Sequence, residues 1–267
     1  MSRKSDIDLF VSKVVSAVTT AGLVAVELQG KVTNLKKMGA SAKKRALTQA
    51  DLACQEIILK SVLDYCPDVI LYAEERTNLA KSFLSVASRW MVVVDPIDGS
   101  LRYFDKDTSF GIQVALVHKD VYVAAIVGLP KRNIVLSARR GMGTLLHSGS
   151  TVRIDRIPEC QKVVFCHDKV SSSERKTIRS LGFETSKRCG AEITTAPVIG
   201  TAAAGIRPEY VSLFGRIGAM ITIEAGGFCC DKKGQQIKQI TTAHMSSLIV
   251  ADCKETAELI VSNSCCH

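Results

Sequence analysis

The sequence lacks the signatures of several functional classes. Its five histidines include no His-Glu-x-x-His pair and its ten cysteines include no Cys-x-x-Cys element, so neither a zinc protease nor a zinc ribbon is indicated. Aromatic residues make up only 5% of the chain, and no nucleic-acid-binding motif is recognised. These absences argue against a nucleic-acid partner and leave small-molecule chemistry as the better interpretation.

Membrane and secretion signals are also missing from the sequence. No uninterrupted apolar run reaches the ~18 residues of a membrane span, and residues 1–6 lack the apolar segment of a secretory signal. We therefore expect a cytoplasmic protein without a membrane partner, whose cysteines stay reduced. With 267 residues, 46% of them hydrophobic, the chain is long enough for one large or two closely packed domains.

Acidic residues are outnumbered, and the formal net charge is +9. A basic run over residues 36–45 precedes the segment Thr48-Gln49-Ala50-Asp51. Such a run is typical of a solvated loop. It also fits a funnel that draws an anionic substrate toward a nearby site.

The most informative stretch that is present begins with the apolar run 91–94, which delivers Asp95 to the end of a predicted strand. Pro96 has no N–H for the next ladder bond, so we expect it to end that strand. Asp98 follows, and Gly99-Ser100 closes a turn. Open α/β sheets bind ligands at the carboxyl ends of their strands, and paired carboxylates suit Mg²⁺.

Two further acidic elements precede this stretch. Glu74 and Glu75 follow the apolar run 69–72, and Asp51 stands at the head of a predicted helix. Taken singly, each acid is typical of a turn, a strand end or a helix cap. In this order and at these spacings, the three elements together predict a site for a hard cation.

This combination resembles the inositol monophosphatase superfamily of Mg²⁺-dependent, lithium-sensitive phosphatases. Its central motif stands here as Asp95-Pro96-Ile97-Asp98-Gly99-Ser100. The weaker elements of the resemblance, which spans roughly residues 7–252, are Thr48-Gln49-Ala50-Asp51, Ala73-Glu74-Glu75, Glu224-Ala225-Gly226-Gly227, Asp231 and Gly234.

The resemblance implies an α/β fold, layered as an α-β-α-β-α sandwich of the inositol monophosphatase and fructose bisphosphatase type. It implies an amino-terminal α+β half over residues 1–150 that carries the metal motifs, and a carboxyl-terminal α/β half over 151–267. It further implies a phosphomonoesterase with Mg²⁺ as cofactor and a small phosphorylated substrate, first inositol monophosphate. A 3′(2′),5′-bisphosphate nucleotidase is the alternative, and a homodimer is allowed.

Roles carry over residue by residue. Glu74, Asp95 and the backbone carbonyl of Ile97 are expected to hold one metal ion, and Asp95 and Asp98 to share a second. Ser100, where Thr is commoner, is expected to orient the attacking water. The backbone amides of Gly99 and Ser100 are expected to meet the phosphate, with Asp98 on the substrate side. Asp51 completes the expected catalytic group of Glu74, Ser100 and Asp51, near a third, weaker metal or its water.

The sequence departs from the family at one metal-ligand position. The family has an Asp ten residues before the Glu of Glu-Ala-Gly-Gly, and here that position is Phe214. Glu209 is the only acid nearby. Arg216 is a weak candidate to replace the metal as a positive charge, because two helical steps rotate about 200° and turn it away. Three interpretations follow: a phosphatase with a weakened second metal, an enzyme in which Glu209 replaces the missing Asp, or a non-catalytic protein that binds phosphate compounds.

Hydrophobic periodicity also predicts the secondary structure. The helices expected from it cover residues 10–28, 51–65, 172–181, 195–204, 213–225 and 254–261, and the strands cover 69–74, 91–95, 112–116, 121–125, 133–138, 143–146, 163–166, 228–230 and 247–251.

Overall fold

The computed structural model describes residues 4–29, 49–83 and 88–264. The basic run 36–45, and with it the predicted funnel for an anionic substrate, lies outside these residues, as does Thr48. The helices longer than one turn are α1 (Lys4–Gln29), α3 (Gln49–Tyr65), α4 (Ser100–Phe104), α5 (Ser172–Ser180), α6 (Gly190–Thr195), α7 (Ile217–Glu224) and α8 (Lys254–Ser264). Short 3₁₀ turns are η1 (Leu79–Ser82), η2 (Pro130–Arg132) and η3 (Phe214–Arg216).

The strands form two sheets. The first sheet has the order β1-β2-β3-β4-β5-β6-β7, and the second has the order β11-β12-β10-β8-β9. Their bounds are β1 (Ile70–Ala73), β2 (Trp90–Asp98), β3 (Gly111–His118), β4 (Val121–Leu129), β5 (Ile134–Arg139), β6 (Gly143–Ser148), β7 (Ser150–Ile154), β8 (Val163–Cys166), β9 (Glu184–Lys187), β10 (Ala204–Arg207), β11 (Phe228–Cys230) and β12 (Leu248–Ala251).

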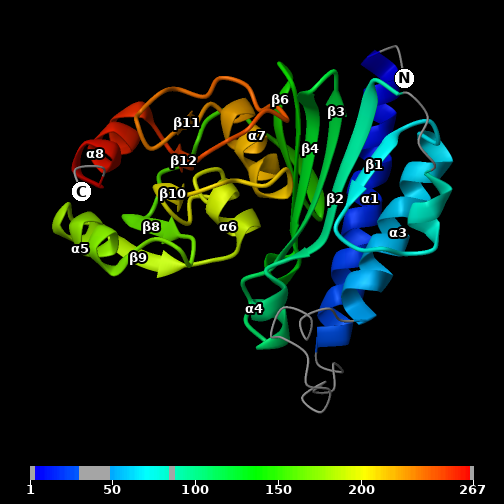
Figure 1. Cartoon of the computed structure of the whole chain (residues 1–267), viewed down its shortest axis with the longest axis horizontal. Coiled ribbons are helices and arrows are strands. Elements are labelled where there is room, and N and C mark those ends of the chain that lie inside the picture. Colours follow the sequence, from blue (N-terminus) through cyan, green and yellow to red (C-terminus); the bar gives the residue numbers. More distant parts are fainter. Residues whose placement is uncertain (1–3, 30–48, 84–87, 265–267) are drawn as a thin grey trace.

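Five layers alternate in Figure 1. Helices α1 and α3 cover one face of the first sheet, α6 and α7 lie between the two sheets, and α5 and α8 cover the far face of the second sheet. The α-β-α-β-α sandwich predicted from the resemblance is therefore the observed architecture. The layering places the carboxyl ends of β1 and β2 beside the elements that follow β10.

Strand β2 is buried on both faces, and this explains its continuous apolar run. Val92 and Val94 pack into the core with α1 and α3, whereas Val93 packs into the core with α7. Successive side chains of a strand point to opposite faces. Asp95 therefore faces the same side as Val93, toward the middle helical layer.

Helix α1 is an amphipathic core helix, as its spacing predicts. Phe10, Val14 and Ala21 are fully buried against the first sheet and α3. By length and composition, residues 5–29 are also apolar enough to cross a membrane, with 44% of the most apolar window buried in the protein. A core helix passes the same test, so the feature is weak support for a membrane span.

The prediction that Pro96 ends its strand is wrong. Strand β2 continues to Asp98, and its pairing with β3 shifts register between Asp95 and Asp98. A bulge leaves a residue without a ladder partner, so the missing N–H of Pro96 costs no ladder bond there. Because of the bulge, Asp98 does not follow the alternation of side-chain faces along β2 that points Asp95 toward the middle helical layer.

The other differences from the expected elements lie mostly in the second half of the chain. The helix expected over 195–204 is wrong: α6 ends at Thr195, and β10 begins at Ala204. Strands β7 and β9 are additional, and both are short and polar. The predicted division at residue 150 falls at the first residue of β7, which is the last strand of the first sheet.

Candidate functional site

Two neighbouring strands carry Glu74 and Asp95 to the same level. Strands β1 and β2 run parallel with Ala73 opposite Val94, and the amide of Glu74 donates to the carbonyl of Val94 at 3.2 Å. The next residue on each strand is therefore an acid, and the Glu74 and Asp95 carboxyl groups are hydrogen-bonded to each other. Both residues come from elements that the sequence predicts, and the fold brings them into contact.

Asp51 approaches this pair from the first turn of α3, where its side chain is buried. One turn later on the same helix, Gln55 is fully buried and holds the loop that carries the acids. Its amide nitrogen donates to the carbonyl of Glu75 at 2.7 Å, and its oxygen accepts from the amide of Glu75 at 3.0 Å. Gln55 thus positions the backbone beside Glu74, and no sequence motif points to it.

The charges in this acidic cluster, which we define as Asp51, Glu74, Asp95 and Asp98, act strongly on one another. Burial is the largest cause that raises the pKa of Asp95, followed by the charges of Asp98 and Glu74. Burial likewise raises the pKa of Glu74, although part of that side chain is accessible to solvent. The neighbouring Glu75 has a pKa raised to about 7, chiefly by burial and then by Asp51 and Glu74.

These features fit a cation between Glu74 and Asp95. The Oδ1 atom of Asp95 is buried with no hydrogen-bond partner, and leaving a buried carboxylate oxygen unsatisfied is costly. The Ile97 carbonyl accepts from the Ser100 hydroxyl at 3.1 Å, which keeps the predicted backbone ligand and the predicted water-orienting hydroxyl together. One or two carboxylates, a carbonyl and water or phosphate oxygens are a usual Mg²⁺ environment.

Asp98 is placed differently from the other acids. Its Oδ2 atom accepts from the backbone amide of Ala191, in the first turn of α6, at 2.5 Å. As the side chains stand, no three His, Cys, Asp or Glu residues in the described part of the chain form a group that could hold a metal ion. Glu74 and Asp95 are thus a pair, and Asp98 contributes to it through its charge.

Gly99 explains how the chain turns from β2 into α4. It has φ of 89°, a left-handed conformation that glycine adopts without strain. A Cβ at this position would lie 2.8 Å from Cβ of Cys189, the residue before α6. The turn that presents Gly99 and Ser100 therefore requires glycine for its conformation and for its close approach to α6.

Phe214 stands beside this site without contributing a ligand. Its ring packs on Tyr72 of β1, with ring centroids 5.0 Å apart, two residues before Glu74. Glu209 does not replace the missing acid, since its carboxylate pairs with Lys169 at 3.0 Å and its side chain is 55% exposed. As it stands, Glu209 is paired with Lys169 and does not supply the absent ligand.

Other charged candidates have structural partners. Arg216 is buried, as its expected turn away from the site implies, and its guanidinium donates to four backbone carbonyls. Arg102 pairs with Asp107 and Asp168, at 3.2 Å each. In the Glu-Ala-Gly-Gly segment, Glu224 accepts from the amides of Gly141 and Gly143, so it holds the turn between β5 and β6.

Arg207 is a functional candidate outside every sequence motif. It is the last residue of β10, and its Nη1 atom is buried without a hydrogen-bond partner. The signal that points to Asp95, a charged residue at the end of an apolar run, is also present here after residues 202–206. This signal was missed because a helix, and no strand, was expected over residues 195–204.

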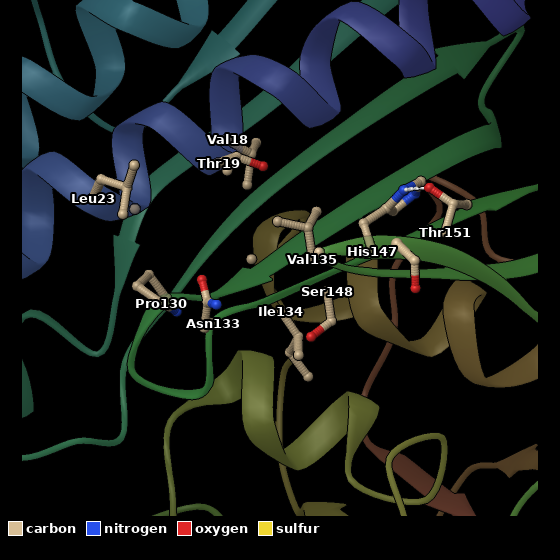
Figure 2. Close-up of a pocket in the computed structure, with 14 residues that line it drawn as sticks. Val18, Thr19, Leu23, Pro130, Asn133, Ile134, Val135, His147, Ser148 and Thr151 are labelled. Carbon is tan, nitrogen blue, oxygen red and sulfur yellow. Dashed lines mark hydrogen bonds between the residues drawn. The ribbon is translucent and has the colours of Figure 1, made fainter.

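One cavity of the structure lies apart from the acidic cluster. That cavity, of about 180 Å³, lies between α1 and the strands β4 to β7 on the opposite face of the first sheet. Figure 2 shows Val18, Thr19 and Leu23 of α1 facing Pro130, Asn133 and His147 across it. None of its lining residues belongs to the acidic cluster, so this cavity is separate from the candidate metal site.

Comparisons with known proteins bear on this arrangement. The model of the inositol monophosphatase family matches residues 8–206. An inositol-1-monophosphatase of Synechocystis is 26% identical over 143 residues, which are 54% of this chain and 48% of that protein. The Nus factor SuhB of Escherichia coli is 29% identical over 111 residues, 40% of each protein. In both matches the chain spans half or less of the relative's length.

Solved structures agree on the architecture. The structure of a Thermotoga maritima IMPase superposes with a TM-score of 0.71 and 19% sequence identity, covering 94% of this chain and 96% of that one. At that identity the likeness shows the fold alone.

Proposed function

We propose, because this chain belongs to the inositol monophosphatase family, that it is a Mg²⁺-dependent phosphomonoesterase acting on a small phosphorylated substrate. Inositol monophosphate is the first substrate to test, and a 3′(2′),5′-bisphosphate nucleotide is the second. The observation that carries the proposal is the meeting of Glu74 and Asp95 at the ends of adjacent parallel strands, with the Oδ1 atom of Asp95 buried and unsatisfied.

The chain's own residues then have distinct tasks. Glu74, Asp95 and the Ile97 carbonyl would hold Mg²⁺, which supplies charge for the phosphoryl group and a more acidic bound water. The Ser100 hydroxyl, 3.1 Å from the Ile97 carbonyl, would orient that water. Asp51 adds negative charge near the water, and Asp98, Gly99 and Ser100 face the substrate. Phosphoryl transfer asks mainly for such positioning and charge stabilisation.

The test is phosphate release from a panel of small phosphate esters, with and without Mg²⁺. We expect Mg²⁺-dependent release by the unaltered chain and its loss in Asp95→Asn, which keeps the shape of the side chain and removes its charge. Asp64→Asn is the matched control, because Asp64 is an exposed acid on α3 outside the cluster. Turnover that persists in Asp95→Asn would contradict the proposal.

A catalytically impaired protein that binds phosphate compounds is the second candidate function. Phe214 favours it, because a metal site without one carboxylate loses about 4 kcal/mol of charge interaction at ~4 Å and an effective dielectric near 20. The similarity to a protein named as a Nus factor is compatible with a non-enzymatic role. Phosphate binding without release from any ester in the panel would support this candidate over the enzyme.

For the substrate, Arg102 next to the central motif could have met the second phosphate of a bisphosphate nucleotide, but that side chain already pairs with Asp107 and Asp168. The remaining expectations stay proposals: a cytoplasmic location, no nucleic-acid or membrane partner, and a homodimer as the assembly to test by light scattering.

A further inference from the structure

Arg207 occupies a space that two glycines leave open. A Cβ at Gly215 would lie 2.7 Å from the Cζ atom of Arg207, and a Cβ at Gly190 would collide with its Nη1 atom. The guanidinium therefore lies between the start of α6 and η3. A larger residue at either glycine would displace the guanidinium, so the two glycines leave the space that this charge occupies.

The same space adjoins Asp98. A Cβ at Gly190 would lie 3.0 Å from Oδ1 and 3.2 Å from Oδ2 of Asp98, so the acid and the Arg207 guanidinium flank one glycine. His167 lies near both: burial is the first cause that lowers its pKa, Arg207 lowers it further, and Asp98 opposes them. Gly215 directly follows Phe214, which packs on Tyr72. Arg207 is thus a positive charge on the side of the cluster where the sequence lacks an acid.

Arg207 differs from three other arginines around the middle helical layer, because their side chains have partners in the protein. Arg132 and Arg188 both pair with Glu192, and Arg216 donates to backbone carbonyls. The Nη1 atom of Arg207, by contrast, is buried with its donor capacity unused. A buried guanidinium N–H without an acceptor is costly, and the group that satisfies it best is a planar or tetrahedral oxyanion.

We propose that Arg207 takes the place of a second metal ion, so that the phosphoryl group is held between one Mg²⁺ at Glu74 and Asp95 and the guanidinium of Arg207. This inference rests on the proposed function for its substrate. A second Mg²⁺ at Asp98 would face the neighbouring positive charge of Arg207, would lack the carboxylate absent at Phe214, and would have to draw Asp98 from the Ala191 amide. Arg207 supplies the charge at that position without a metal.

Isothermal titration calorimetry of the full chain tests the proposal without relying on turnover. Mg²⁺ is titrated alone and with inorganic phosphate, and inorganic phosphate is titrated in saturating Mg²⁺. We expect one Mg²⁺ per chain in each case. Phosphate affinity should fall about ten- to a hundredfold in Arg207→Gln, which loses a charge-assisted pair of hydrogen bonds. Arg207→Lys should retain part of the affinity, because lysine keeps the positive charge but lacks the paired N–H donors of the planar guanidinium.

Arg179→Gln is the matched control for loss of one positive charge, since Arg179 lies on α5 and donates to Thr185. Its phosphate affinity should equal that of the unaltered chain. Thermal unfolding of each variant, measured beside the titrations, separates a binding defect from a folding defect. If Arg207→Gln folds and binds phosphate as well as Arg179→Gln does, the proposal is wrong.

A paired substitution tests the exchange of arginine for metal directly. Phe214→Asp alone should still bind one Mg²⁺, because the new acid meets Arg207. Phe214→Asp combined with Arg207→Gln should bind two. A second Mg²⁺ in the unaltered chain, or only one in the double variant with its fold intact, overturns the proposal.

These outcomes are separable from those of the proposed function. A chain that binds one Mg²⁺ and then phosphate through Arg207, but releases no phosphate from any ester, would contradict the enzymatic function and support the role of Arg207. A chain that hydrolyses esters, and whose Arg207→Gln variant binds phosphate as well as the unaltered chain, would support the enzymatic function and contradict the role of Arg207.

Discussion

The two sides of the acidic cluster are built on different principles. On the side of β1 and β2, Glu74 and Asp95 lie at the ends of adjacent parallel strands, with one oxygen of Asp95 buried and unsatisfied. On the side of α6 and η3, Asp98 accepts from the Ala191 amide, and Arg207 flanks it. Under the proposed function, the first side would take a cation from outside the chain, whereas the second already contains the positive charge of Arg207.

Position 214 lies on the second side, where the resemblance implies an acid. An acid at position 214 would add negative charge to the second side and favour a metal there. Phe214 instead adds an aromatic contact with Tyr72 and leaves Arg207 as the local charge. The electrostatic need of a phosphoryl group, two positive centres, is the same in either arrangement. Under the proposed role of Arg207, the chain would meet that need with one ion and one side chain.

The largest expected effect is on Mg²⁺ affinity, and it is tested by one substitution on each side of the cluster. Glu74→Gln should weaken Mg²⁺ binding about a thousandfold, because removing one ligand charge at ~4 Å costs about 4 kcal/mol. Asp98→Asn should change Mg²⁺ affinity less than about tenfold, since Asp98 already accepts from the Ala191 amide. Calorimetric titration measures both. Equal losses in the two variants would show that the sides are not different.

The next comparison is between two arginines, Arg207 and Arg216. Arg216→Met should lower the free energy of unfolding by about 3 kcal/mol, because it leaves four backbone carbonyls without their donor. Arg207→Gln should change stability by less than about 1 kcal/mol, since its Nη1 atom makes no hydrogen bond to lose. Urea denaturation of both variants, without Mg²⁺ or phosphate, gives the two values. A larger loss in Arg207→Gln would assign it a structural role.

A smaller effect is expected from Gln55, which acts on the first side alone. Gln55→Leu removes the two hydrogen bonds to the Glu75 backbone and should cost about 1–3 kcal/mol of stability. Mg²⁺ affinity should also fall by about tenfold, because the loop that carries Glu74 loses its support. Phosphate affinity measured in saturating Mg²⁺ should be unchanged. An unaltered Mg²⁺ affinity would limit Gln55 to a structural role.

The smallest expected effect is a pH dependence confined to the first side. The folded-state pKa of Glu75 is raised to about 7, and those of Glu74 and Asp95 are raised as well. The folded state therefore holds protons that the unfolded state has released, so metal-free stability should fall as pH rises from about 4.5 to about 7. Saturating Mg²⁺ should flatten this decline. Thermal unfolding temperatures across that range test it, and a rising metal-free stability would contradict the assignment.

Much of this site could be predicted because its signals are local. The spacing of Asp95, Asp98 and Gly99 indicates acids at a strand end, and the upstream position of Glu74 follows the same pattern. The fold brings Glu74 and Asp95 together as their positions imply. The failure at Pro96 has a tertiary cause, since only the register shift against β3 tells that its missing N–H costs nothing.

Apolar periodicity indicated that β2 is a buried strand, because that signal is local. The resemblance carried by the central motif implied the layered fold and a site shared by Glu74 and Asp95. Only the tertiary structure decided which way Asp98 turns, what Phe214 contacts and where the Arg207 guanidinium lies. The last of these depends on space left by Gly190 and Gly215, which lie against the guanidinium from separate elements. Charge at a site is a sum over all such neighbours, and no single stretch of sequence contains it.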